Sequence, residues 1–179
     1  AADMYLLAEE TMSARQYRHY EISNWAVPGY ESRHNLVYWR NEPNLGVGPG
    51  AHSYLGGVRF WNLRSPGEYV RRVRKLAPPS EVDGWPMAEI VGRMPMVERS
   101  ETIDRRMEMS ETLMMGLRLD TGVGVSEFVT RFGEPPTAGY GDAIEELSSV
   151  GLLDDAGGRL RLTDRGRMLG DEVFSRFFS

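Results

Sequence analysis

The spacing of hydrophobic residues predicts helices and strands in alternation from the start of the chain. Across residues 4–12, hydrophobic side chains recur every three to four positions, which is typical of an amphipathic helix with Asp3 at its N-cap. Residues 17–23 then alternate between two faces, as the side chains of a strand do. A helix followed directly by a strand indicates the tail of an α/β unit.

Short elements follow in the next part of the chain. Residues 34–40 predict a short helix or a turn, residues 45–54 a glycine-rich strand and loop, and residues 58–63 a second short strand. Ser65 and Pro66 should open another helix, because Ser is favoured at the N-cap and Pro at the first helical position. The buried face of that helix is expected to consist of Tyr69, Val70 and Val73.

Proline and glycine are concentrated in residues 77–96, which favours a linker there. Beyond it, hydrophobic periodicity predicts a long helix over residues 103–117 and a short helix that Ser126 caps. A third helix is expected over residues 142–150, and Gly151 closes it.

The end of the chain predicts a β-hairpin over residues 152–162 and a last helix that Thr163 caps. Three helices, a hairpin and a helix are the order of a winged-helix-like domain. We therefore expect an α/β part at residues 1–76, a linker at residues 77–99 and a mostly helical, winged-helix-like domain at residues 100–179.

The composition excludes several classes of site. The chain has no cysteine, so it cannot hold a disulfide, a thiolate zinc site, a cysteine nucleophile or a cysteine-bound iron–sulfur cluster. No apolar run approaches the roughly 20 residues that a membrane-spanning helix needs. No secretory leader is visible, so we expect a cytoplasmic protein. Because the chain opens at Ala1 in a helical pattern without an initiator Met, we expect a fragment of a longer protein.

The most distinctive string is HNLVYW, at residues 34–39. If it is helical, His34 and Tyr38 lie four positions apart and share a face. Imidazole and phenolate are both axial ligands of heme iron, and Trp39 could stack on a porphyrin plane. The alternative is a buried aromatic cluster in which His34 and Asn35 are simply hydrogen-bonded. The three histidines of the chain do not have the spacing of a metal site.

Two further groups of residues are candidates for a ligand site. Glycines around Pro49 allow a backbone to approach a ligand closely and to present its N–H and C=O groups, although they could equally form a tight barrel corner. The candidate ligand-binding residues in this segment are Gly48, Gly50, Ala51 and His52. Glu21 and Asn24 lie at the end of the first strand, where polar residues of an α/β barrel face the active site. Their side chains could instead form hydrogen bonds with polar groups of the loop below.

A winged-helix-like pattern raises the question of nucleic-acid binding. The net charge is −5, and the predicted third helix carries Asp142, Glu145 and Glu146 without a Lys or Arg. Phosphates would repel a recognition helix of that charge, so nucleic acid is not the expected partner. The basic residues of the hairpin and the segment after it are expected to pair with acidic partners instead: Arg159, Arg161, Arg165 and Arg167.

Several strings together resemble the C-terminal half of the HemN/HemW family of radical-SAM proteins, which includes oxygen-independent coproporphyrinogen III oxidases and heme chaperones. The strings, in order, are YEISNWA (residues 20–26), PGYESRHNLVYWR (28–40), LGVGPGAHS (45–53), WN (61–62), LMMGLRL (113–119) and GLL with RLT and a following Gly (151–166). This resemblance implies an incomplete, TIM-like barrel of parallel strands. Residues 17–24 would form its last strand and residues 46–53 would lie beside the S-adenosylmethionine pocket.

The family resemblance also implies chemistry that this chain cannot perform alone. A CxxxCxxC loop in the family's N-terminal half holds a 4Fe-4S cluster that cleaves S-adenosylmethionine to a radical. This chain has no cysteine, so we expect the cluster to lie in a missing N-terminal half, which would be one of its partners, and the fragment alone to be catalytically inactive.

Within the family, the HNxxYW string resembles the motif linked to heme binding in the chaperone branch, which passes heme to acceptor proteins. That resemblance makes His34, Asn35, Tyr38 and Trp39 the expected heme-binding residues, with His34 as the iron ligand and Tyr38 as the second choice. Two alternatives stay open: a true oxidase that decarboxylates coproporphyrinogen III to protoporphyrinogen IX, and a winged-helix nucleic-acid-binding module.

Overall fold

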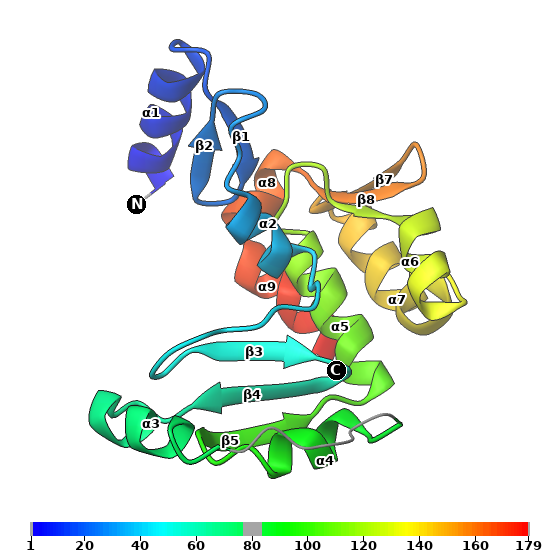
Figure 1. Ribbon diagram of the computed structural model, residues 1–179. Coiled ribbons are helices and arrows are strands. Elements are labelled where there is room, and N and C mark those ends of the chain that lie inside the picture. Colours follow the sequence, from blue (N-terminus) through cyan, green and yellow to red (C-terminus); the bar gives the residue numbers. More distant parts are fainter. Residues whose placement is uncertain (1, 77–83, 179) are drawn as a thin grey trace. The chain divides into compact units, whose positions relative to one another are not determined.

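The computed structural model describes residues 2–76 and 84–178 (Figure 1). The chain forms two compact units. The first unit comprises Ala1–Asn41 together with Met109–Ser179, and the second unit comprises Glu42–Glu108. This division differs from the expected one, in which a linker at 77–99 joined two parts that were each continuous in sequence. Residues 77–83 of that linker lie outside the described residues.

The first stretch of the first unit holds a helix, a two-stranded sheet and a second helix. The elements are α1 (Ala2–Ser13), β1 (Arg18–Glu21), β2 (Asn24–Ala26) and α2 (Arg33–Trp39). β1 pairs antiparallel with β2 and continues its backbone pairing to residues 118–120, where Ile22 N donates to Arg118 O at 3.0 Å. Every strand pair among the described residues is antiparallel, so the expected barrel of parallel strands is not seen. A parallel neighbour reaches β1 only through a crossover connection, which these residues lack.

The second stretch of the first unit packs helices around a three-stranded antiparallel sheet of order β6-β8-β7. The elements are α5 (Arg105–Gly116), which begins in the second unit, β6 (Val123–Gly124), α6 (Val125–Phe132), α7 (Pro136–Ser149), β7 (Leu153–Ala156), β8 (Arg159–Leu162), α8 (Asp164–Met168), α9 (Gly170–Ser175) and a 3-10 turn (Arg176–Phe178). The side chains that fill its core come from both helices and hairpin, and include Leu113, Leu117, Phe128, Ile144, Leu160, Val173 and Phe177.

The local signals of this stretch predicted most elements but misplaced several ends. The N-cap of α6 is Gly124 and not Ser126, because β6 runs directly into the helix. α7 begins six residues before position 142, since Pro136 occupies its first turn, and it bends at Tyr140, which has a non-helical φ of −132°. The last helix is divided at Leu169, whose φ of −117° and ψ of 30° are not helical.

α8 lies very close to the turn that precedes the hairpin. Thr163 caps the helix as predicted, accepting from Gly166 N at 3.0 Å, and it donates through its own hydroxyl to Gly151 O at 2.7 Å. A Cβ added at Gly166 would lie 1.9 Å from the carbonyl oxygen of Leu152. Glycine is therefore required at this position because the two backbones nearly touch.

The second unit is a three-stranded antiparallel sheet with two helices. Its strands run in the order β3 (His52–Leu55), β4 (Val58–Asn62) and β5 (Val97–Thr102), and its helices are α3 (Pro66–Val73) and α4 (Met87–Gly92). Val91 of α4 packs against Val58 and Phe60 of the central strand to form a small core. α4 and the first residues of β5 lie inside the predicted linker, so the described part of that linker is folded onto the sheet.

The predicted buried face of α3 is wrong. Val70 is 43% exposed, and Tyr69 and Val73 are only half-buried. The helix does begin as predicted, with Ser65 as its N-cap and Pro66 in its first turn. Hydrogen bonds attach it to the unit instead: Gly48 N donates to the Tyr69 hydroxyl at 3.3 Å, and Arg72 donates to Pro95 O at 3.1 Å.

Candidate functional site

The HNLVYW string is helical, which decides between the helix and the turn that its sequence allowed. The Ser32 side chain accepts a hydrogen bond from Asn35 N at 3.3 Å and caps the first turn of α2. Helical geometry places side chains four positions apart on one face. His34 and Tyr38 therefore share one face of α2, and Asn35 and Trp39 share another.

The first of these faces points to solvent. The Tyr38 hydroxyl and His34 Nε2 are hydrogen-bonded at 3.3 Å, and the two rings meet edge to face with centroids 4.9 Å apart. His34 is exposed, and Tyr38 is 40% exposed. An imidazole and a phenol thus lie next to each other on an open helix face, within reach of a planar ligand.

The second face of α2 attaches the helix to the first unit. The Asn35 side chain donates to the Tyr20 hydroxyl of β1 at 3.3 Å. The guanidinium carbon of Arg118 lies 4.7 Å from the centroid of the Trp39 ring, and Trp39 Nε1 is buried with no hydrogen-bond partner in the described part of the chain. Because Arg118 covers the Trp39 ring, Asn35 and Trp39 serve the attachment of α2.

The C-terminal end of α2 is fixed by a second arginine. Asn41 is 4% exposed and has a left-handed φ of 50°, and its side chain donates to the Thr112 hydroxyl at 3.1 Å. Arg131 donates to Arg40 O at 3.2 Å and to Asn41 O at 2.8 Å. The carbonyl groups of the C-cap residue and of the residue after it are therefore bound by a guanidinium group.

Glu21 and Asn24 lie together, in the tight turn between β1 and β2. The Glu21 carboxylate accepts from Ser23 N at 3.1 Å and from the Asn24 side chain. Glu21 is only 1% exposed, and its Oε2 has no hydrogen-bond partner within the described residues. These hydrogen bonds are the ones that the alternative interpretation predicts, in which the two side chains bind polar groups of the loop.

The glycine-rich segment belongs to the second unit. Gly48 and Gly50 have φ values of 106° and 69°, which favour glycine. Their backbone groups are bound within the unit: Gly50 N donates to Leu63 O at 2.9 Å, and the Asn62 side chain donates to Gly48 O at 2.9 Å. Ala51 O accepts from the backbone N of the same Asn62 at 2.9 Å. The loop is thus held by hydrogen bonds to residues 62 and 63 of the same unit.

His52 follows this loop at the start of β3. Its exposed ring is stacked on Trp61 across the strand pair, with centroids 5.5 Å apart. Gly48, Gly50, Ala51 and His52 are therefore brought together in the second unit, and the four HNxxYW residues are brought together on α2 in the first unit.

A network around His19 was not found by sequence reasoning. The His19 ring stacks flat on Trp25, with centroids 4.5 Å apart, and its Nε2 donates to Ile22 O at 2.8 Å. Arg167 lies 3.2 Å from His19 Nδ1 and 3.0 Å from the Asp120 carboxylate. The expectation that Arg167 pairs with an acidic residue is met here. No local pattern links the whole network, because Asp120 and Arg167 come from parts of the chain distant from His19.

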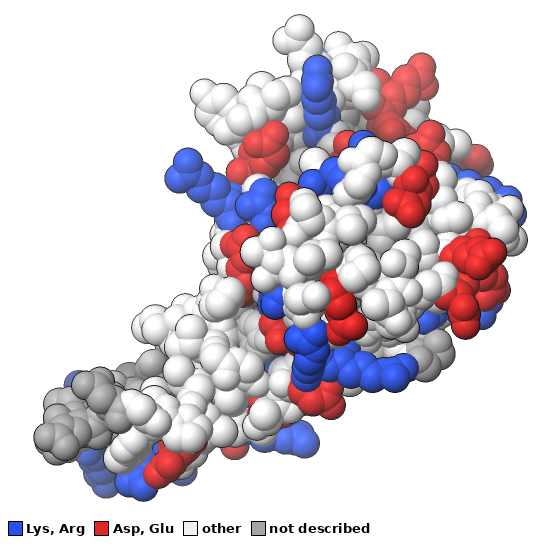
Figure 2. Space-filling model, turned by 90° about the vertical axis from the view of Figure 1, so that its right-hand side faces the viewer, with Lys and Arg blue, Asp and Glu red and all other residues white. Residues whose placement is uncertain are grey.

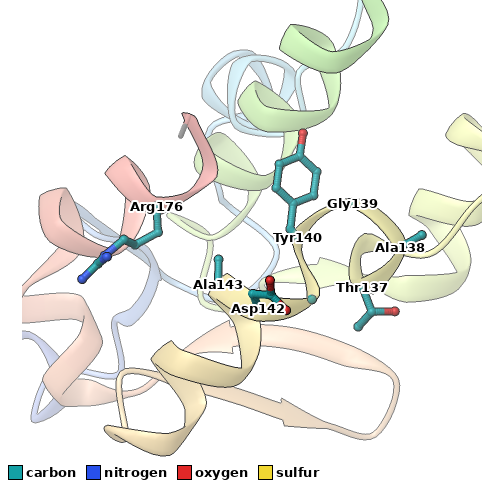
Figure 3. A pocket seen from close by; sticks show the side chains of 8 residues that line it. Thr137, Ala138, Gly139, Tyr140, Asp142, Ala143 and Arg176 are labelled. Carbon is teal, nitrogen blue, oxygen red and sulfur yellow. The ribbon is translucent and has the colours of Figure 1, made fainter.

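Two of the cavities formed by the described residues lie in the first unit, and neither of these two is lined by a predicted site residue. The cavity in Figure 3 has a volume of about 320 Å³ and lies at the first turns of α7, where Asp142 and Arg176 approach it with opposite charges. The other has a volume of about 670 Å³ and is lined in part by His19, Asp120 and Arg167. Over residues 2–76 and 84–178, no cluster of three or more His, Asp and Glu is placed to hold a metal ion.

The surface charges are mixed. On the face shown in Figure 2, basic and acidic side chains are interspersed. α7 carries Asp142, Glu145 and Glu146 and no basic residue, as expected for the shorter helix that the sequence predicted. No described helix is long and apolar enough to cross a membrane.

Comparison with known proteins identifies relatives for nearly the whole chain. Residues 103–169 match the HemN C-terminal domain. The heme chaperone HemW of Lactococcus lactis is 35% identical over 98% of this chain and 41% of that protein, and that of Bacillus subtilis is 31% identical over 98% and 42%. The structure of coproporphyrinogen III oxidase (HemN) from Escherichia coli, a radical SAM enzyme, has a TM-score of 0.66 at 15% identity, over 98% of this chain and 40% of that one.

The solved structure, at 15% identity, is evidence for the fold alone. The chain spans about two fifths of the length of the curated relatives that it matches. The domain match and the HemW relatives agree with the motifs in the sequence. This mixed α/β chain belongs to the HemN/HemW family.

Proposed function

We propose that this chain is the C-terminal part of a heme chaperone, which binds heme through α2 and delivers it to acceptor proteins. The observation that carries the proposal is the His34–Tyr38 pair, exposed on a helix whose neighbouring face is anchored. The names of the HemW relatives support the same function.

The chemistry of the exposed pair fits heme. Imidazole nitrogen and phenolate oxygen are both axial ligands of heme iron. His34 is the proposed iron ligand and Tyr38 the second choice, because the exposure of His34 leaves it accessible and Tyr38 is adjacent to it. The four proposed heme-binding residues then have two roles: His34 and Tyr38 contact the ligand, and Asn35 and Trp39 hold the helix.

S-adenosylmethionine and a 4Fe-4S cluster belong to the proposal for the whole protein only. The chain has no cysteine to ligate a cluster, so no step of radical chemistry is assigned to its residues. Gly48, Gly50, Ala51 and His52 stay the proposed S-adenosylmethionine contacts. Glu21 and Asn24 also stay proposed contacts of that ligand in the whole protein.

The finer assignment of the fold is also a proposal. β1 (Arg18–Glu21) would be the last strand of the radical-SAM barrel. It is shorter than the strand expected over residues 17–24, because the chain turns at residues 22–23 and enters β2 at Asn24. The whole protein would be cytoplasmic, and the second stretch of the first unit would be winged-helix-like. The exposed hydrophobic side chains of α1 are Met4, Leu6 and Leu7, at 76%, 55% and 63% exposure. Apolar side chains that open to solvent fit a helix that packs against the N-terminal half of the barrel.

Heme titration of the purified protein tests the proposed function. We expect a stoichiometric absorbance shift, an affinity on the order of tenfold weaker for His34→Ala, and a smaller loss with an altered spectrum for Tyr38→Ala. His52→Ala is the matched control, because it removes another exposed histidine that stacks on an aromatic ring, in the other unit. Unchanged affinity and spectrum in both α2 variants would reject the proposal.

A porphyrinogen oxidase is the second candidate, and its support is the fold shared with the HemN structure. Turnover of coproporphyrinogen III by the full-length protein, reconstituted anaerobically, would favour it. For a winged-helix nucleic-acid-binding module, the acidic surface of α7 is unfavourable. Salt-dependent retention on DNA would be required to support that reading.

A further inference from the structure

α2 is too short to keep its own orientation. It has seven residues, and isolated helices of fewer than about 12 residues are marginal in water. None of its residues is fully buried. The direction in which His34 and Tyr38 point is therefore set by the contacts on the neighbouring face of the helix and at its C-terminal end.

One of these contacts is made by Arg118. Its backbone carbonyl accepts from Ile22 N at 3.0 Å, which fixes residue 118 beside the end of β1. Its guanidinium carbon lies 4.7 Å from the Trp39 ring centroid and 5.5 Å from the Phe174 ring centroid. One cation thus bridges α2 and α9, which come from opposite ends of the chain (Figure 1).

The environment of Arg118 makes this bridge specific for arginine. A planar guanidinium can stack on aromatic rings, which the compact ammonium of lysine does less well. Arg118 Nε is buried and has no hydrogen-bond partner among the residues described, so part of the cation is shielded from water. Shielding strengthens the attraction of a cation to an aromatic ring. Arg131 supplies a second anchor, at the carbonyl groups of residues 40 and 41.

We infer that Arg118 is a positioning residue for the heme site: it orients α2, and through it the His34–Tyr38 pair, without touching the ligand. This inference rests on the proposed function of that pair. Its physical basis is the ring contact with Trp39, which lies on the face of α2 that does not carry the pair.

Two measurements on Arg118→Met test the inference, one without heme and one with it. Hydrogen exchange of the α2 amides at residues 36, 40 and 41 should become at least about fivefold faster, because the α2 anchor is lost, while α7 amides keep their rates. Heme affinity should fall severalfold, and the absorption spectrum of the complex should change. Arg118→Lys should restore part of the slow exchange of α2 and part of the heme affinity.

Arg165→Met is the matched control, because Arg165 also lies in the first unit but donates to Val150 O at 3.0 Å, at the C-cap of α7. It should change neither measurement. If α7 amides also exchange faster in Arg118→Met, the whole unit has loosened. Arg118→Lys then tests the inference, because lysine keeps the charge but loses the flat contact with Trp39. α2 should then exchange faster in Arg118→Lys than in the native chain while α7 does not.

Unchanged α2 exchange in the Arg118 variants would overturn the inference. So would faster α2 exchange with unchanged heme affinity and spectrum, because orientation of the helix would then not matter. The proposed function fails separately, if His34→Ala in the otherwise native chain binds heme normally. In that case, the exchange rates alone decide whether Arg118 orients α2.

Discussion

Replacing Gly166 with alanine tests the close approach of α8 to the turn before the hairpin. The added Cβ would lie 1.9 Å from Leu152 O and 2.9 Å from the Leu152 carbonyl carbon. Both are backbone atoms, so no side chain can rotate away to relieve the contact. α8 would have to move by roughly 1 Å or more, because close-packed interiors leave no room for an extra methyl group.

The magnitude follows from the bonds that this movement breaks. Thr163 N donates to Leu152 O at 3.1 Å, and the Thr163 hydroxyl donates to Gly151 O at 2.7 Å. Each hydrogen bond contributes about 0.5–1.5 kcal/mol. Overpacking adds typically about 1–3 kcal/mol, and the better helix propensity of alanine returns about 1 kcal/mol. We expect the free energy of unfolding to fall by about 1–5 kcal/mol.

Urea denaturation followed by circular dichroism measures this change, with Gly139→Ala as the matched control. Gly139 also lies in a helix, but a Cβ added there meets no atom within 4 Å. That variant should be more stable by up to about 1 kcal/mol, from helix propensity alone. If Gly166→Ala proved as stable as the native chain, or if both variants gained stability equally, the close contact at Leu152 would be refuted.

Three further predictions concern other parts of the first unit. Leu113→Ala removes a side chain that is 0% exposed and should lower the free energy of unfolding by about 2–5 kcal/mol, measured by urea denaturation. Burial raises the pKa of Tyr5 above 10.0, so stability that is present below pH 10 is lost as the pH rises through the raised pKa. Thermal unfolding above pH 10 should therefore show that Tyr5→Phe loses less stability with rising pH than the native chain. An equal loss of stability per pH unit in the two chains would contradict this. Arg167→Met removes a donor shared by His19 and Asp120 and should destabilise by about 1–3 kcal/mol in urea, whereas Arg165→Met should cost less.

Local signals in the sequence predicted those elements that short-range interactions define. Ser65 with Pro66 marked the start of α3, Thr163 marked the start of α8, and paired glycines marked the turn of the β7–β8 hairpin. The helical alternative for residues 34–40 was correct, and with it the shared face of His34 and Tyr38. Each of these features depends on residues within about four positions of one another.

The features that the sequence did not reveal depend on distant residues or on very short elements. β6 has only two residues, and it is recognised as a strand only by its pairing with β8. β5 reads VERSET, an exposed edge strand whose charged residues hide the alternation that marks a strand. The contact of Arg118 with the Trp39 ring brings together residues from different halves of the chain, so no sequence motif predicts it.

The discontinuity of the first unit has a consequence for how the chain folds during translation. The hydrogen bond between Ile22 and Arg118 closes a loop of about 100 residues, and the second unit lies entirely inside that loop. At about 5–20 residues per second, the ribosome needs roughly 5–20 s to deliver the partner of β1. During that interval the second unit can complete its own sheet, which holds the ends of the loop nearer to each other. Within this chain, the stretch that emerges before the second unit is thus completed only after it.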